Sequence, residues 1–265
     1  MNQAIVKDSN AEYHAHGKEV ISASGLKMIA KKSVAHYLAS AGIKETDSMR
    51  LGTAVHAKIL EPENYHDEIA VLPELNLRTK DGRLERDQFE EKNQGKTIIR
   101  QDDLDTIQGI YESYKAHPLA PRLLNNAKIE LSHYGEIQNI PVRCRPDAYI
   151  EETGVVIDVK TCQDNSPKAF RRDVFTYGYH IQAAFYCEAL KKITDREFSP
   201  LNFRFIAVET NYPYSCEVYS LSEDMIAWGY QAMEKAWDEW KLYKETGVIL
   251  GYQTEETSAD GALIL

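Results

Sequence analysis

Apolar residues recur along the chain at two different spacings, and the spacing changes near Lys128. Before that point, and again after Ser166, most apolar residues recur every three or four positions, as on a helix that buries one face. From Lys128, short runs rich in β-branched residues alternate with turn residues, which is the pattern of strands. Strands framed by helices on both sides indicate a single α/β domain.

This pattern predicts helices over about 22–38, 48–60, 102–117, 179–193 and 222–245, and a short helix that opens at Ser166-Pro167. It predicts three successive strands within 129–159 and two more near 203–209 and 216–221. Residues 74–96 are rich in charge, Asn and Gln, so we expect a flexible excursion there. We therefore expect a flexible N-terminus (1–20), one folded domain (21–246) and a weakly structured tail (247–265).

The bulk composition is that of a globular protein, with 43% hydrophobic and 27% charged residues in a chain of 265. No apolar run approaches the roughly 18–20 residues that span a bilayer. The N-terminus has no signal-peptide pattern, so we expect a cytoplasmic protein that has no membrane segment. The cysteines lie far apart without a Cys-x-x-Cys pair, which favours reduced thiols over a zinc site or a disulfide framework.

Candidate chemistry is concentrated around two aspartates and a lysine. Asp147 ends a basic stretch, and Asp158 and Lys160 interrupt an otherwise apolar strand. A hairpin that turns at Thr153-Gly154 would bring the two aspartates together at one end of adjacent strands. Because Asp158 and Lys160 are two residues apart, their side chains point to the same face of the strand.

Charges on an apolar strand are costly unless they are paired or bound to an ion. Two neighbouring aspartates favour a hard cation with oxygen ligands, and we expect Mg²⁺, with Mn²⁺ as a substitute. Such an ion would polarise a scissile phosphate, while Lys160 would position the attacking water or stabilise the developing negative charge. The alternative is a structural ion pair between Asp158 and Lys160 that performs no chemistry.

Three polar residues on predicted helices are candidates to complete this site. His56 follows the small residues Gly52 and Ala54 and could reach a metal as a neutral imidazole, although a histidine at a core boundary fits the same pattern. Gln182 and Tyr186 are four residues apart and share a helix face. There the amide could hold the catalytic aspartate, the lysine or a phosphate; the alternative is an amphipathic helix with a half-buried tyrosine.

Other charged residues flank the acidic pair. Glu130 is a candidate for a further carboxylate near the metal, or a solvated strand residue. We expect several basic residues to contact the phosphates of bound DNA, although a solvated helix face explains two of them, Arg171 and Arg172, about equally well. These candidates are Arg143, Arg145, Lys168, Arg171 and Arg172.

The formal net charge of −10 argues against a broad basic surface for DNA. It does not exclude a protein that confines its positive charge to a channel while its exterior stays acidic.

Taken in order, the motifs Gly52-x-x-x-His56, Asp147, Asp158-x-Lys160 and Gln182-x-x-x-Tyr186 resemble those of the RecB-type branch of the PD-(D/E)xK nucleases. Within that branch, the chain resembles the RecE-type (exonuclease VIII-like) nucleases of phages and prophages. The supporting stretches are 33–37, 51–62, 144–147 and 179–182, and the resemblance runs from about Ile21 to Glu209. Each motif is weak by itself, whereas the ordered set is specific.

The resemblance implies a mixed central β-sheet flanked by helices, the restriction-endonuclease-like core. It implies 5′-to-3′ degradation of one strand of linear double-stranded DNA, which leaves 3′ single-stranded overhangs for recombination by single-strand annealing. It also implies a ring-shaped homo-oligomer threaded by DNA and a RecT-like annealing protein as partner. Carried over by position, the Mg²⁺ ligands would be His56, Asp147, Asp158 and the Val159 carbonyl, with Lys160 as the catalytic lysine and Gln182 and Tyr186 ordering the site.

Two other functions stay open at this point. One is an endonuclease of the same fold, and the other is a catalytically silent module that binds nucleic acid or a partner protein. The intact set of Asp147, Asp158 and Lys160 argues against the silent module, because a binding module has no reason to keep a costly acidic pair beside a lysine. The cysteines do not match the spacing of iron–sulfur relatives, so we predict no cluster.

Overall fold

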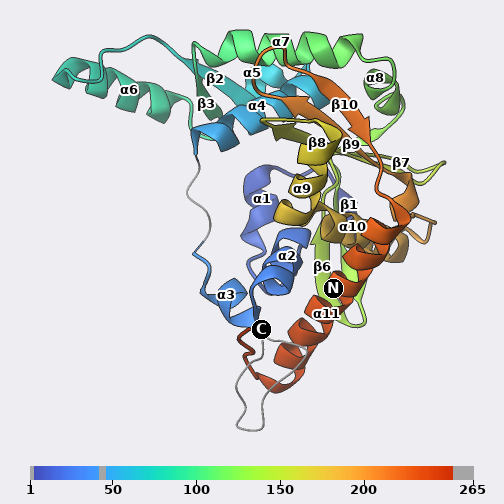
Figure 1. Cartoon of the computed structure of the whole chain (residues 1–265). Helices are drawn as coiled ribbons and strands as arrows, with labels where there is room; N and C mark the ends of the chain where they lie inside the picture. Colours follow the sequence, from blue (N-terminus) through green and yellow to red (C-terminus); the bar gives the residue numbers. More distant parts are fainter. Residues whose placement is uncertain (1–2, 42–45, 253–265) are drawn as a thin grey trace.

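A five-stranded mixed sheet forms the centre of the protein (Figure 1). The computed structural model describes residues 3–41 and 46–252. The strands stand in the order β10-β9-β8-β7-β4, and only β8 and β9 are parallel to each other. Their bounds are β4 (Lys128–Ile129), β7 (Ala148–Ile150), β8 (Val155–Cys162), β9 (Phe203–Glu209) and β10 (Cys216–Tyr219). The α/β class and the mixed central sheet are confirmed.

Two smaller sheets accompany the central one. An antiparallel sheet has the order β1-β5-β6, and β2 pairs with β3 in parallel. Their bounds are β1 (Ala4–Val6), β2 (Ile69–Leu72), β3 (Thr97–Arg100), β5 (Ser132–Ile137) and β6 (Ile140–Cys144). The region in which three strands were expected therefore holds five. The sequence pattern did not separate β4 and β7 from their neighbours, because these strands have only two and three residues.

Helices cover both faces of the central sheet, and the alternation of side chains along its strands separates two cores. On one face, Val156 and Phe205 pack with α2 (Ala23–Lys31), α10 (Tyr179–Thr194) and α11 (Glu223–Thr246). On the other face, Ile157 and Val159 pack with α4 (Asp47–Leu60), α5 (Tyr65–Glu68) and α7 (Asp103–Ala116). The remaining helices are α1 (Asn10–Ala15), α3 (Val34–Ala39), α6 (Lys80–Lys92), α8 (Ala120–Leu123), α9 (Pro167–Tyr177) and the short 3₁₀ helix η1 (Pro200–Asn202).

Side-chain caps set the starts of the main helices. The Ser22 hydroxyl accepts from the Gly25 N–H at the start of α2, and Thr46 does the same for Met49 at the start of α4. Ser33 caps α3, which divides the single helix expected over 22–38 into two. Within the described ranges, no helix is both long and apolar enough to cross a membrane.

Two segments that we expected to be flexible have regular structure. β1 pairs with β5, and α1 follows with a Ser9–Glu12 capping box, so the described part of 1–20 packs on the body of the protein. Within 74–96, Thr79 caps α6, which is rich in the helix-forming residues Arg, Glu and Lys and projects from the rest of the molecule (Figure 1). Residues 247–252 form neither helix nor strand, and the rest of the expected tail lies outside the described residues.

Candidate active site

The two aspartates stand side by side on neighbouring strands. Ala148 of β7 pairs with Ile157 of β8, which places Asp147, just before β7, beside Asp158. One oxygen of Asp147, Oδ2, accepts a hydrogen bond from the backbone N–H of Val159 at 2.6 Å. The hairpin predicted from the Thr153-Gly154 turn is therefore present, and it brings the carboxylates together.

Asp158 lies at the centre of a buried polar cluster. Asp158 is only 1% exposed. It lies on the face of β8 that also carries Lys160. Its Oδ1 accepts from Gln182 Nε2 of α10 at 2.6 Å, and its Oδ2 forms an ion pair with Lys160 Nζ. Of the three partners that the sequence allowed for the Gln182 amide, the structure therefore selects the aspartate.

A second lysine, Lys27 of α2, completes this cluster. Its Nζ donates to Gln182 Oε1 at 3.2 Å, so the amide turns its oxygen to Lys27 and its NH₂ group to Asp158. Burial and the neighbouring Lys160 lower the pKa of Lys27 to about 8. Sequence reasoning missed Lys27, because a lysine on an amphipathic helix gives no sign of the partner that the fold supplies.

His56 of α4 reaches the same place from the opposite side. Its Nδ1 lies 3.5 Å from Asp147 Oδ2, and its side chain is 27% exposed. Burial, and then the positive charge of Lys160, lower the pKa of His56, which favours the neutral imidazole. Burial and the adjacent Asp158 carboxylate raise the pKa of Asp147 well above its ordinary value.

The described residues around Asp147 are of the types that bind a divalent cation, but their side chains are not arranged around a metal position. Within the described residues, no group of three or more His, Cys, Asp or Glu side chains is arranged to hold a metal ion. Protein groups instead take the carboxylate oxygens, as in the Val159–Asp147 bond. Asp158 Oδ2 is nevertheless buried with no hydrogen bond besides its ion pair. Two adjacent carboxylates and a neutral imidazole are ligands that such a cation accepts.

Tyr186 connects the site to a pair of arginines. Its hydroxyl donates to the Arg145 carbonyl at 3.2 Å, and burial raises its pKa well above the ordinary value. The guanidinium groups of Arg143 and Arg145 lie 5.3 and 4.5 Å from the centre of the Tyr13 ring. Gln182 and Tyr186 of α10 thus fix the site from two directions, through Asp158 and through the β6–β7 segment.

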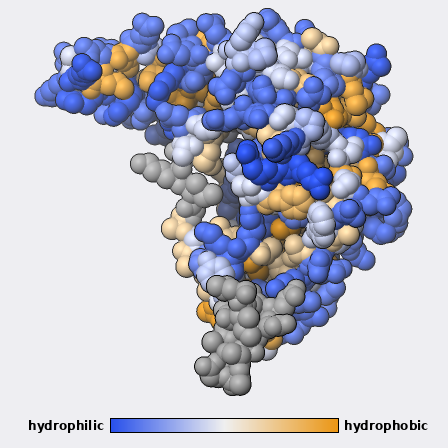
Figure 2. Space-filling model, viewed as in Figure 1, coloured by the Kyte–Doolittle hydropathy of each residue, from blue (hydrophilic) through white to orange (hydrophobic). Residues whose placement is uncertain are grey.

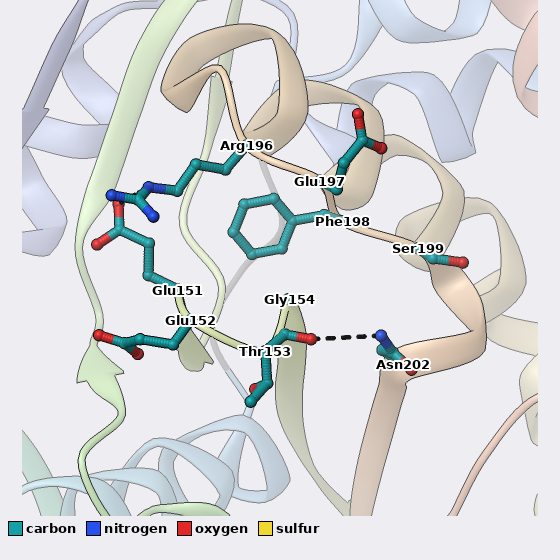
Figure 3. A pocket seen from close by; sticks show the side chains of 9 residues that line it. All are labelled: Glu151, Glu152, Thr153, Gly154, Arg196, Glu197, Phe198, Ser199 and Asn202. Atoms are coloured by element: carbon teal, nitrogen blue, oxygen red, sulfur yellow. Dashed lines mark hydrogen bonds and ion pairs between the residues drawn. The ribbon is translucent and has the colours of Figure 1, made fainter.

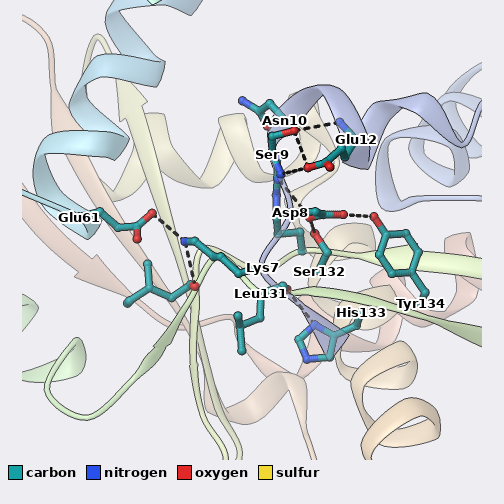
Figure 4. Close-up of polar contacts among 12 residues, drawn as sticks. Lys7, Asp8, Ser9, Asn10, Glu12, Glu61, Leu131, Ser132, His133 and Tyr134 are labelled. Carbon is teal, nitrogen blue, oxygen red and sulfur yellow. Dashed lines mark hydrogen bonds and ion pairs between the residues drawn. The ribbon is translucent and has the colours of Figure 1, made fainter. Parts of the chain in front are cut away.

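The N-terminal segment holds Arg145 in place. Asp8 accepts hydrogen bonds from Ser132 and Tyr134 (Figure 4). The Oδ1 atom of Asp8 also lies 3.9 Å from Arg145 Nη1. Burial acts to raise the pKa of Asp8, but these hydrogen bonds and Arg145 lower it overall. Asn10 accepts a further bond from Arg145. A segment expected to be flexible therefore builds part of the site.

A cavity of about 1100 Å³ lies beside these groups, and several of them line it. Its wall includes His56, Asp147, Lys160, Tyr186 and both arginines, with residues of α1, α2 and α4. The basic residues of α9 that we expected to contact DNA are exposed and lie outside this wall; they are Lys168, Arg171 and Arg172. Strongly hydrophilic residues gather over α9 in Figure 2.

Glu130 lines the same cavity. This position is compatible with the first of our two alternatives for Glu130, a further carboxylate near the metal. Glu130 follows β4 with a φ of 45°, and its N–H donates to the Asp147 carbonyl at 3.0 Å. Glu68 of α5 lines the cavity as well, and burial followed by the charge of Glu130 raises its pKa. The sequence did not reveal Glu68, because it lies in a surface-like acidic stretch far from the other site residues.

Another cavity, of about 380 Å³, lies at the Thr153-Gly154 turn, at the opposite end of β8 from Lys160 (Figure 3). Three of its charged residues are paired: Arg196 Nε contacts Glu151 Oε1 at 3.0 Å, and Glu197 pairs with Lys191. Asn202 closes the turn by donating to the Thr153 carbonyl at 3.4 Å. These groups hold the hairpin and offer no reactive arrangement.

Comparison with known proteins agrees with this geometry. Residues 22–248 match the model of a family described as a PDDEXK-like domain of unknown function (DUF3799). The fold is similar to the crystal structure of a putative exonuclease from Eubacterium rectale, with a TM-score of 0.63 and 14% identity over 92% of this chain and 88% of that one. No curated protein matches the chain. The chain belongs to this PDDEXK-like family, and its Asp–Asp–Lys cluster lies in a restriction-endonuclease-like core.

Proposed function

We propose that the protein is a Mg²⁺-dependent exonuclease that degrades one strand of linear double-stranded DNA from the 5′ end. The observation that carries the proposal is that Asp147 and Lys160 line a cavity that also contains Arg143 and Arg145, with the buried Asp158 directly beside them. Carboxylates beside a lysine suit phosphodiester hydrolysis, and the arginines suit phosphate binding. Membership of the PDDEXK-like family supports nuclease activity in general.

We assign each residue a role that its contacts support. His56, Asp147, Asp158 and the Val159 carbonyl would hold the cation, with Mn²⁺ able to replace Mg²⁺. The bound ion would polarise the scissile phosphate and lower the pKa of the attacking water. Lys160 Nζ stabilises negative charge that develops on the phosphate, Gln182 fixes the orientation of Asp158, and Tyr186 holds the backbone beside Arg145.

The finer part of the proposal is a RecE-type role in recombination. The chain would leave 3′ single-stranded overhangs for a RecT-like annealing protein, act in the cytoplasm and assemble into a ring around DNA. The order of the motifs from His56 to Tyr186 supports this type, and the free thiols of the four cysteines suit a reducing compartment. The description of the Eubacterium rectale protein as a putative exonuclease points the same way. A ring with a basic channel and an acidic exterior would also accommodate the net charge of −10.

Linear duplex DNA labelled at either the 5′ or the 3′ end tests the proposal, with Mg²⁺ or with a chelator. We expect Mg²⁺-dependent release of the 5′ label as short products, while covalently closed circular DNA stays intact. Cleavage of the closed circle would instead identify an endonuclease. The Lys160→Met variant is expected to lower kcat by about 1000-fold or more, since it removes a charge that acts on the transition state.

The control is Lys191→Met, because Lys191 is also ion-paired, with Glu197 at 2.9 Å, but lies outside the cavity. Lys191→Met is expected to melt within a few degrees of the unaltered protein, and a melting curve of Lys160→Met checks that this variant is folded at the assay temperature. Unchanged activity in Lys160→Met contradicts the assigned mechanism. Calorimetric binding of Mg²⁺ without any DNA cleavage would point to the silent module.

A further inference from the structure

The junction of α9 and α10 has an unusual arrangement of aromatic side chains. Gly178 joins the two helices in the left-handed conformation, with φ 68° and ψ 37°. In a continuous helix, residues two apart point in different directions and cannot stack. Because the chain turns at Gly178, the rings of Tyr177 and Tyr179 do stack, with centroids 5.7 Å apart and planes at 30°.

These rings extend a series that begins in the core. Tyr179 stacks on Phe205 of β9 at 5.7 Å and 29°, and Phe205 is completely buried. Tyr177 is 54% exposed at the other end. We call Phe205, Tyr179 and Tyr177 the aromatic series. Its inner rings are packed against the protein, so the outer ring is held on a rigid base while much of its surface faces solvent.

The aromatic series passes directly beside the catalytic lysine. Lys160 Nζ lies 4.8 Å from the centroid of the Tyr179 ring. One further ring spacing leads to Tyr177, so a group on Tyr177 would lie within about three nucleotides of the phosphate at Lys160, given one phosphate per ~3.4 Å of strand. The exposed tyrosine is therefore within reach of the same DNA strand that the site would cleave.

Basic residues lie on two helices that meet near this tyrosine, α2 and α9. Lys31 of α2 donates to the Thr176 and Phe175 carbonyls, which places its ammonium group next to Tyr177. The exposed Arg171 and Arg172 lie on α9, the helix that ends at Tyr177. Nucleic-acid strands are commonly bound by an aromatic ring that stacks on a base while nearby cations bind the phosphates.

We propose that Tyr177 is a stacking platform for a nucleobase of the DNA strand that enters the active site. This inference rests on the proposed function, because it takes DNA as the substrate. Stacking on a ring accepts any base, so the platform would hold the strand near Lys160 without sequence preference. It would act on binding of the strand, whereas Lys160 acts on the chemical step.

The test uses short duplexes in which one terminal base at a time is replaced by 2-aminopurine, whose fluorescence falls when it stacks. Binding is measured without divalent cations, so that no cleavage intervenes. We expect quenching at a limited set of positions in the unaltered protein and in Tyr177→Phe, and loss of that quenching in Tyr177→Ala. Tyr177→Ala should also raise Kd by roughly five- to 150-fold, or ~1–3 kcal/mol.

The matched control is Leu201→Ala, because Leu201 is equally exposed, at 54%, but lies on η1, which hydrogen-bonds to the far hairpin turn. With Mg²⁺, Tyr177→Ala should raise KM and leave kcat nearly unchanged. If the protein cleaves DNA but Tyr177→Ala keeps the quenching and the KM, the platform is refuted and the proposed function stands. If the unaltered protein neither binds nor cleaves DNA, both proposals fail.

Discussion

The two groups of basic residues that flank the acidic pair are built in opposite ways. Arg143 and Arg145 are recessed in the cavity, where residue Arg143 is 6% exposed and the Arg145 side chain 13%. Both lie over the Tyr13 ring. Arg143 donates a hydrogen bond to the Gly17 carbonyl, and Arg145 donates one to the Asn10 side chain. By contrast, the basic residues of α9 face solvent, and the Arg172 side chain is 71% exposed.

This difference indicates two kinds of contact with a charged substrate. A buried guanidinium has already lost most of its hydration and much of its side-chain freedom, so it can bind a phosphate in a defined geometry. An exposed arginine attracts DNA over a longer range, but water and salt screen it. We therefore expect the cavity arginines to affect catalysis and those of α9 to affect mainly association.

The largest effect in this comparison is expected for Arg145→Met. The change removes a cation that would bind a phosphate in the cavity, and it leaves Asp8 without its charged neighbour. We expect kcat/KM on linear duplex DNA to fall by roughly 30-fold or more. The control is Arg196→Met, whose 3.0 Å contact with Glu151 lies in the far cavity. Equal losses in both variants would contradict a special role for Arg145.

A smaller effect is expected when the arginine stays and its support is removed. In Asp8→Asn the side chain keeps its shape but loses its charge, so Arg145 is held less firmly. We expect kcat/KM to fall by about tenfold, the usual scale for one weakened charged contact. Glu12→Gln is the control, because the bonds that the described residues give the Glu12 carboxylate go to Ser9, within the α1 capping box. If both variants behave alike, the effect comes from α1 stability and not from Arg145.

The smallest effect is expected on α9. Arg171→Ala combined with Arg172→Ala should weaken DNA binding by several-fold and leave kcat unchanged. The slope of log K against log salt concentration should become shallower by about 0.9 for each phosphate contact that is lost. Binding measured by fluorescence anisotropy over a range of salt concentrations provides this slope. A large fall in kcat with no change in slope would mean that α9 belongs to the catalytic machinery.

Much of the fold and the centre of the site could be predicted from local patterns. The hairpin turn, the apolar strand and the two-residue spacing of Asp158 and Lys160 sufficed to place both aspartates and the lysine together. The four-residue spacing of Gln182 and Tyr186 likewise put both on one helix face, and the structure shows both at the site. These predictions succeeded because strand and helix periodicity decides on its own which way a side chain points.

Other features could not be read in this way. Composition indicated flexibility for 1–20 and 74–96, yet β1 pairs with β5 and Thr79 caps α6. Pairing with a strand more than a hundred residues away leaves no local signature, since it depends on which edge the fold leaves open. The assignment of Lys168, Arg171 and Arg172 to DNA contacts stays a prediction, and the structure adds that they lie outside the cavity.

The sequence by itself determined the α/β class, the order of the motifs and the face of β8 on which Asp158 and Lys160 lie. Only the tertiary structure decided which partners these charges have: Lys27 against Gln182, Tyr179 beside Lys160, and Asp8 beside Arg145. The physical reason is that secondary-structure periodicity acts over a few residues, whereas the cost of burying a charge is met by whichever group the packing brings near. The buried cluster and its anchored arginines are therefore properties of the assembled domain.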